Sequence, residues 1–228
     1  MQSKLALIHT SPILTPLFTT LCAKWMPEVE IFHMVDESLI RNTIEAGSLQ
    51  RITVRRLISM VESAGNAGAD AVLVTCSAIG EALSTAQGLF DFPVIRVDEA
   101  MAEKAVTMGR RIGVLATLRI ALEPTTALVR QKAEGKDVKI VECLCDGAFE
   151  AVLAGDTTTH DAIVSKGLLK LVKGVDVVVL AQASMARVLT SMGPGAVQIP
   201  VLSSPELAVL RTRDVLLGSL GQLEEVSA

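Results

Sequence analysis

The sequence predicts an α/β protein made of two pseudo-symmetric parallel-sheet units, with the functional site in the cleft between them. Apolar runs of strand length alternate along the chain with segments that carry apolar residues at helical spacing, which is typical of parallel α/β proteins. Two of the strands have the same form: each follows an aspartate, and superposing Asp176 on Asp70 puts Gln182 on Cys76. The separation is 182 − 76 = 106 positions, so the two strands occupy equivalent places in a repeat.

Three more strands repeat in the same order. Residues 111–117 match 4–10, residues 138–143 match 29–34, and residues 200–202 match 93–95. The offsets of 107, 109 and 107 positions (117 − 10, 138 − 29 and 200 − 93) are nearly constant. Four collinear matches indicate an internal duplication into units of domain size. We therefore expect a first unit at residues 1–97 plus 206–228 and a second unit at residues 98–205.

In the first unit, short apolar runs bounded by polar or turn residues predict four strands. They are expected at residues 4–9, 29–35, 70–75 and 93–97. Helices are expected at residues 14–26, 48–67 and 78–87. The helix at 48–67 is the clearest, because its apolar residues recur near a period of 3.6 with arginines between them.

The second unit repeats this order. Its strands are expected at residues 111–117, 138–143, 176–182 and 200–202, and its helices at 99–108, 120–134 and 161–172. A closing helix at 207–220 is expected to pack back on the first unit, followed by a frayed tail at 221–228.

Composition excludes several classes of protein. The chain is 50% hydrophobic and only 3% aromatic, so its core is aliphatic. Its net charge is −4, and its Lys and Arg residues are scattered rather than clustered, so no basic patch is expected that would bind nucleic acid or an anionic membrane. Its apolar runs are far shorter than the ~20 residues of a membrane span, and no glycine-rich turn follows the first strand to hold a dinucleotide. We therefore expect a cytoplasmic protein with a small-molecule partner and four reduced cysteines.

Cys76 is the candidate reactive group, because it ends a buried strand where open α/β sheets bind their ligands. The thiolate is the reactive form of cysteine, and the amino terminus of a following helix would lower the pKa of the Cys76 thiol. Cys22, within an apolar helix, and Cys143 and Cys145, on one side of a strand, are expected in the core. The three histidines show no ligand spacing with the last two cysteines, so we expect no metal site.

This arrangement resembles the aspartate/glutamate racemase superfamily, which includes hydantoin racemases, maleate isomerases and arylmalonate decarboxylases. Residues 74–77 are similar to the first cysteine motif of that family, and residues 112–117 are similar to its strand that leads to a carboxylate-binding threonine. Residues 180–185 fall where the second cysteine motif belongs, with Gln182 in place of the thiol. The resemblance implies a cofactor-independent enzyme that acts at a carbon next to a carboxylate, with Cys76 as acid-base group or nucleophile. It also implies a small carboxylate substrate, and we expect a homo-oligomer, a dimer or larger.

Hydroxyl and backbone N–H groups at the strand ends are the candidates for holding the carboxylate. The candidate set comprises Thr10, Ser11, Ser77, Thr117, Ala183 and Ser184. Thr10 and Thr117 are equivalent in the repeat and are expected to grip one carboxylate. Ser11 is equally well explained as a helix cap.

Gln182 has no ionisable proton at neutral pH, so it cannot be the second base of a two-thiol racemase and can only form hydrogen bonds. Cys76 acting alone gives cis–trans isomerisation if it adds to a double bond, and decarboxylation of a malonate-type acid if it protonates an enolate. A different residue could instead supply the second base, and His9 and Asp36 are candidates for it. A non-catalytic carboxylate-binding relative is the further alternative.

Overall fold

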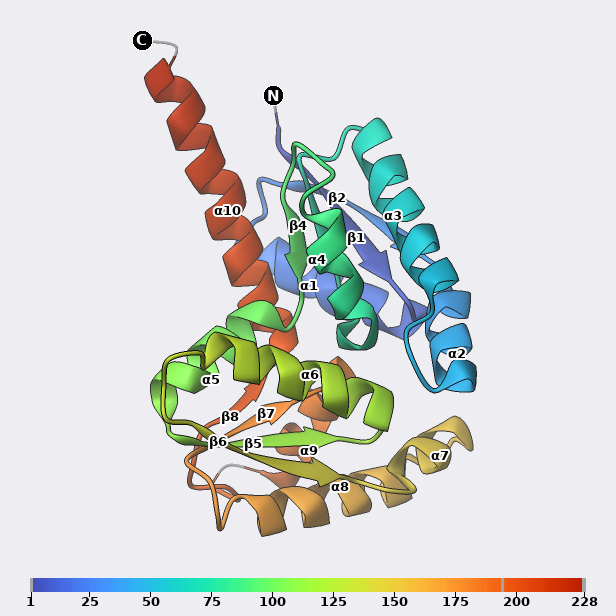
Figure 1. The fold of residues 1–228 in the computed structure, drawn as a ribbon, viewed down its shortest axis with the longest axis vertical. Helices are drawn as coiled ribbons and strands as arrows, with labels where there is room; N and C mark the ends of the chain where they lie inside the picture. Colours follow the sequence, from blue (N-terminus) through green and yellow to red (C-terminus); the bar gives the residue numbers. More distant parts are fainter. Residues whose placement is uncertain (1, 194, 227–228) are drawn as a thin grey trace. The chain divides into compact units, whose positions relative to one another are not determined.

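The computed structural model describes residues 2–193 and 195–226, the last eight by their backbone alone. The chain divides into two compact units, Met1–Val97 with Pro205–Ala228 and Asp98–Ser204. Each unit contains one four-stranded parallel sheet flanked by helices, which confirms the predicted α/β class (Figure 1). No helix in the described ranges is both long and apolar enough to cross a bilayer.

The first sheet has the strand order β2-β1-β3-β4. Its strands are β1 (Lys4–His9), β2 (Glu30–Val35), β3 (Ala71–Val74) and β4 (Val94–Arg96). The helical elements of this unit are η1 (Pro12–Leu14), α1 (Thr15–Trp25), α2 (Glu37–Ala46), α3 (Arg51–Asn66), η2 (Ser77–Ala82), α4 (Leu83–Ala86) and α10 (Ser204–Val226). The strands β1 and β3 are parallel neighbours, and Ile8 lies opposite Val74.

Alternating side chains of the central strands are buried on opposite faces of this sheet. Leu5 and Leu7 pack with apolar residues of α1 and α10, and this group also contains Phe18. Ala6 and Ile8 pack on the other face with residues of α2, α3 and α4. Both faces are therefore covered, as the unbroken apolar runs of the central strands predict.

The second sheet has the order β6-β5-β7-β8, which is the order of the first sheet. Its strands are β5 (Arg111–Ala116), β6 (Lys139–Leu144), β7 (Val177–Leu180) and β8 (Val201–Ser203). The helical elements are α5 (Glu99–Met108), α6 (Arg119–Lys132), α7 (Ala148–Leu153), α8 (Thr157–Leu171), η3 (Ala183–Met185) and α9 (Ala186–Met192). The helices α7, α8 and α9 contribute to one apolar cluster on this sheet.

The aspartates that align in the repeat perform the same task in both units. Asp70 accepts a hydrogen bond from the backbone N–H of Lys4 at 2.8 Å. Asp176 accepts hydrogen bonds from Arg110 and Arg111 at 2.9 and 2.8 Å, and these N–H donors lower the pKa of Asp176 below its usual value. In each case the carboxylate secures the start of the sheet's central strand, so the duplication inferred from the sequence is also present in the local structure.

Three helices were not predicted, namely α2, α7 and α9. The ends of α2 carry recognisable signals: Asp36 accepts from the N–H of Ser38 at its start, and Gly47 ends it with φ 68°. The continuous helix expected at 78–87 is instead the 3-10 segment η2 followed by the short α4. The expected tail at 221–228 is also wrong, since α10 continues to Val226; residues 227–228 lie outside the described part.

Candidate functional site

Cys76 lies two residues beyond the end of β3, on extended backbone with φ −119° and ψ 112°, and it caps the start of η2. Its side chain is partly exposed and packs against the apolar cluster on the α3 face of the sheet. Thr10 follows the neighbouring strand β1 and is almost completely buried. Because β1 and β3 are in parallel register, these two residues end adjacent strands at the same edge of the sheet.

The two serines predicted for this edge have different surroundings. Ser11 is partly exposed and precedes η1, where its side chain makes no capping hydrogen bond. Ser77 is buried at the start of η2. The first unit therefore brings three hydroxyl side chains to the edge that carries Cys76: those of Thr10, Ser11 and Ser77.

A chain of hydrogen bonds runs beneath this edge, on the α1 face of the sheet. Thr75 Oγ1 lies 2.8 Å from His9 Nδ1 and 3.1 Å from the carbonyl oxygen of Ile8, which accepts from it. His9 Nε2 lies 2.8 Å from His33 Nδ1. His33 Nε2 lies 3.0 Å from the hydroxyl of Thr19 on α1. The sequence reasoning missed this chain, although parallel register places His9 level with Thr75.

His9 is unsuited to act as a second base that contacts substrate. Its side chain is fully buried, and both ring nitrogens face other protein groups. Burial, together with the charge of a protonated His33, lowers the pKa of His9 to about 4. Burial also lowers the pKa of His33. At neutral pH this chain of hydrogen bonds therefore connects two neutral imidazoles.

Both carboxylate oxygens of Asp36 are also engaged by other protein groups. One carboxylate oxygen accepts from the N–H and hydroxyl of Ser38 at 3.0 and 2.6 Å, and the other pairs with Arg56 at 2.5 Å. Burial opposes ionisation of the carboxyl group, but the Ser38 and Arg56 contacts outweigh it and lower the pKa of Asp36. Asp36 is therefore an ionised helix cap held by an arginine.

In the second unit, Thr117 and Gln182 are bonded to each other. Gln182 Oε1 accepts from the backbone N–H of Thr117 at 2.7 Å and from its hydroxyl at 3.0 Å. Thr117 follows β5, and Gln182 follows the neighbouring strand β7. Gln182 is partly exposed, whereas Thr117 is buried. A ligand would therefore reach the two donors of Thr117 only by replacing the glutamine oxygen.

Ala183 and Ser184 lie in η3, directly after Gln182. Ala183 is partly buried and Ser184 is exposed. The second unit thus presents an amide, a hydroxyl and backbone N–H groups at the carboxyl edge of its sheet.

The remaining cysteines lie in or against the core, which confirms their predicted role. Cys22 is buried in α1, and burial raises the pKa of its thiol to about 12. Cys145 is buried and Cys143 partly buried in the cluster beneath α8. A hydrogen bond from Cys145 lowers the pKa of Cys143 to about 7. Within the described residues, no group of three or more His, Cys, Asp or Glu side chains is placed to hold a metal ion.

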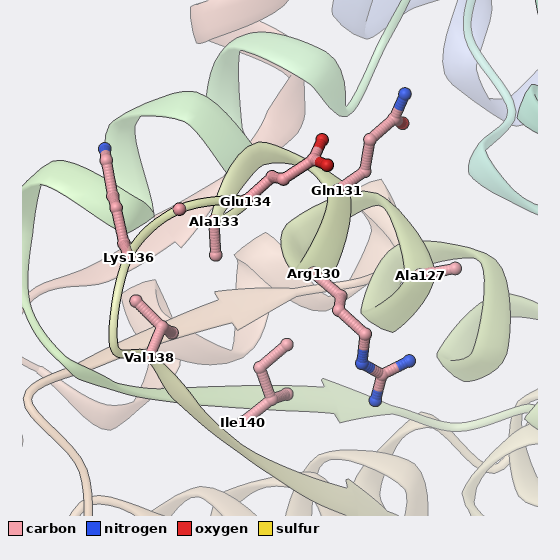
Figure 2. Close-up of a pocket in the computed structure, with 9 residues that line it drawn as sticks. Ala127, Arg130, Gln131, Ala133, Glu134, Lys136, Val138 and Ile140 are labelled. Atoms are coloured by element: carbon pink, nitrogen blue, oxygen red, sulfur yellow. The ribbon is translucent and has the colours of Figure 1, made fainter.

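A hollow of about 620 Å³ lies elsewhere in the second unit (Figure 2). Figure 2 shows Arg130 and Gln131 projecting from the end of α6, with Val138 and Ile140 below them. These residues lie where the chain enters β6, so the hollow is at the amino-terminal edge of the sheet. Thr117 and Gln182 lie at the opposite, carboxyl-terminal edge, and the hollow is therefore not part of the candidate site.

The fold and strand ends define a duplicated parallel α/β protein with a cysteine after β3 and a threonine–glutamine pair after β5 and β7. The chain belongs to the Asp/Glu/hydantoin racemase family, which it matches over residues 8–212. Comparison with curated proteins finds no significant match.

Solved racemase structures have the same fold. The glutamate racemase isoform RacE1 from Bacillus anthracis superposes with a TM-score of 0.74 at 19% identity, covering 95% of this chain and 82% of that chain. The allantoin racemase from Klebsiella pneumoniae has a TM-score of 0.71 at 18% identity, with coverages of 95% and 89%. The Picrophilus torridus aspartate racemase has a TM-score of 0.66 at 14% identity, with coverages of 91% and 91%. At these identities the similarity shows the common fold.

Proposed function

We propose that the protein is a cofactor-independent isomerase that acts at the carbon next to a carboxylate of a small organic or amino acid. The observation that carries this proposal is the family match over residues 8–212. The named structural neighbours are racemases of glutamate, allantoin and aspartate, which supports proton transfer at a single carbon as the type of reaction.

Cys76 is the proposed reactive group, as thiol/thiolate acid-base or as nucleophile. Two features support it: its place at the carboxyl edge of the sheet, where open α/β sheets bind their ligands, and the partial exposure of the residue. Of the other cysteines, Cys22 and Cys145 are buried, and Cys143 lies within β6 rather than beyond a strand end. As a nucleophile, the Cys76 thiolate adds to an activated double bond and is eliminated again after rotation about the resulting single bond, which gives cis–trans isomerisation. As an acid-base group, it removes a proton from an acidic C–H and returns one to the same face, which gives exchange with solvent without inversion of the carbon.

The substrate carboxylate is proposed to be bound by neutral donors at the strand ends. The proposed set is Thr10, Ser11, Ser77, Thr117, Ala183 and Ser184. Thr117 takes part through Gln182, because its own donors are directed at the glutamine oxygen. Hydroxyl and amide donors can stabilise the negative charge that moves onto carboxylate oxygens when the neighbouring carbon loses its proton.

Deuterium exchange tests this proposal. Purified protein is incubated in deuterated water with a panel of small acids, and loss of the α-proton signal is followed by NMR. We expect exchange into at least one acid, and a loss of roughly 10²-fold or more in Cys76→Ser. Cys143→Ser is the matched control, since it removes another partly exposed thiol, and should exchange normally. Undiminished exchange by Cys76→Ser would exclude the cysteine mechanism.

A further inference from the structure

The orientation of the Gln182 amide is determined by its contacts. Its side-chain oxygen and nitrogen have similar shapes, and their identity is normally assigned from hydrogen-bond partners. Here one partner is the backbone N–H of Thr117, 2.7 Å away, which can only donate. The atom that faces it must therefore be the acceptor, Oε1. The Thr117 hydroxyl, at 3.0 Å, donates to the same oxygen and gives the amide a second anchor.

Anchoring the oxygen also determines where the nitrogen points. The amide group is planar, so with Oε1 directed at Thr117 the Nε2 hydrogens are directed away from it. In the part of the chain that the structure describes, Nε2 makes no hydrogen bond of its own. Gln182 is partly exposed while Thr117 is buried beneath it. The group that this strand end offers to a ligand is therefore the NH2 of the glutamine.

We propose that Gln182 is a specificity-determining residue: an amide donor, held in place by Thr117, that binds an anionic oxygen of the substrate. This inference rests on the proposed function and adds a chemical role to the position. The oxygen is either that of the carboxylate itself or the one that gains charge when the neighbouring carbon loses its proton. A donor that is already oriented requires little reorganisation when this charge develops. Thr117 is then a positioning residue that acts through Gln182.

The alternative is that Gln182 only caps the Thr117 N–H, as a structural contact. Gln182→Glu separates the two possibilities, because a carboxylate retains an oxygen for both Thr117 donors but replaces the NH2 by a second acceptor. A purely structural role survives this change. A role in anion binding does not, since the substrate oxygen would then meet a negative charge.

The experiment uses calorimetry to measure how tightly the protein binds maleate, malonate, D-glutamate and L-glutamate. Maleic diamide serves as an uncharged probe. The experiment is done in wild type and in the Cys76→Ser background, so that binding is measured whether or not the cysteine chemistry is correct. Gln182→Glu should weaken anion binding at least about tenfold, and should leave binding of the diamide and the urea midpoint nearly unchanged. Thr117→Val should weaken anion binding less, since the backbone N–H still holds the glutamine oxygen.

Three outcomes would overturn the inference: equal anion affinity in Gln182→Glu and wild type, weakening of the diamide to the same extent, or no binding of any acid by wild type. If wild-type protein exchanged no α-proton in the earlier deuterium experiment but still bound acids in a Gln182-dependent way, only the isomerase function would be refuted.

Discussion

His9 Nε2 lies 2.8 Å from His33 Nδ1, and only one of these two nitrogens can carry the hydrogen between them. If both carried one, two N–H groups would face each other inside the protein. The pair therefore cannot hold two protonated rings. Burial lowers the pKa of both histidines, and repulsion from His33 lowers that of His9 further.

This pair predicts acid sensitivity. The pKa of His9 is about 4 in the folded protein against 6.5 for the free side chain, so between these values the unfolded chain binds a proton that the folded chain does not. Stability should therefore fall as pH drops from about 6.5 to about 4, by roughly 3 kcal/mol for His9, and this contribution should then level off. Urea unfolding at several pH values measures it. The variant His9→Gln should be less stable at pH 7 but should show a shallower slope, and an unchanged slope would contradict the assignment.

The Thr75 hydroxyl joins the ends of β3 and β1 through His9 and Ile8. Thr75→Val should cost about 1–3 kcal/mol of unfolding free energy, because it leaves a buried His9 nitrogen without its partner. Since Thr75 immediately precedes Cys76, deuterium exchange should also slow. Thr20→Val is the control: its exposed hydroxyl bonds only to the Pro16 carbonyl within α1, and the change should stay within about 0.5 kcal/mol. Equal losses in the two variants would refute a special role for Thr75.

Gln182 cannot accept and return a proton, so wild-type protein should racemise aspartate, glutamate and hydantoins negligibly. Gln182→Cys restores a thiol at the strand end equivalent to that of Cys76, and it should gain measurable racemisation of whatever acid the protein binds. Optical rotation with chiral chromatography measures the gain, and Gln182→Ser, which lacks an ionisable thiol, should show none. Rapid α-proton exchange from both enantiomers by wild type would show instead that another residue serves as the second base.

Gly167 provides a packing test in the second unit. A Cβ at this position of α8 would lie 2.6 Å from Cys145 Sγ and 3.4 Å from Leu115 Cδ1. Gly167→Ala should therefore destabilise the protein by about 1–3 kcal/mol, despite the better helix propensity of alanine. The control is Gly218→Ala in α10, where a Cβ would meet nothing within 4 Å. This substitution should stabilise the protein by up to about 1 kcal/mol. Thermal unfolding of both variants decides; a stabilised Gly167→Ala would show that the cysteines move aside readily.

The strands and their duplication follow from the sequence alone, because a buried parallel strand needs an unbroken apolar run and such runs recur in one order. The aspartates before β3 and β7 could be aligned for the same reason, and each proves to secure a neighbouring strand. The short helices were harder to predict from the sequence. Asp36 and Gly47 mark the ends of α2, but most side chains between them are polar or charged, so the few apolar ones do not establish a helical period.

The positions of the candidate residues at strand ends were likewise predictable, but their hydrogen-bond partners were not. Sequence spacing places Thr117 and Gln182 at equivalent ends of neighbouring strands, yet only the folded chain shows the glutamine oxygen occupying both threonine donors. In the same way, His9 and His33 are separate residues in the sequence, and the register of β1 and β2 together with burial beneath α1 makes them a neutral pair. A residue's type and element are local properties of the sequence, whereas the direction of a hydrogen bond and the cost of charging a buried ring depend on atoms brought close by tertiary packing.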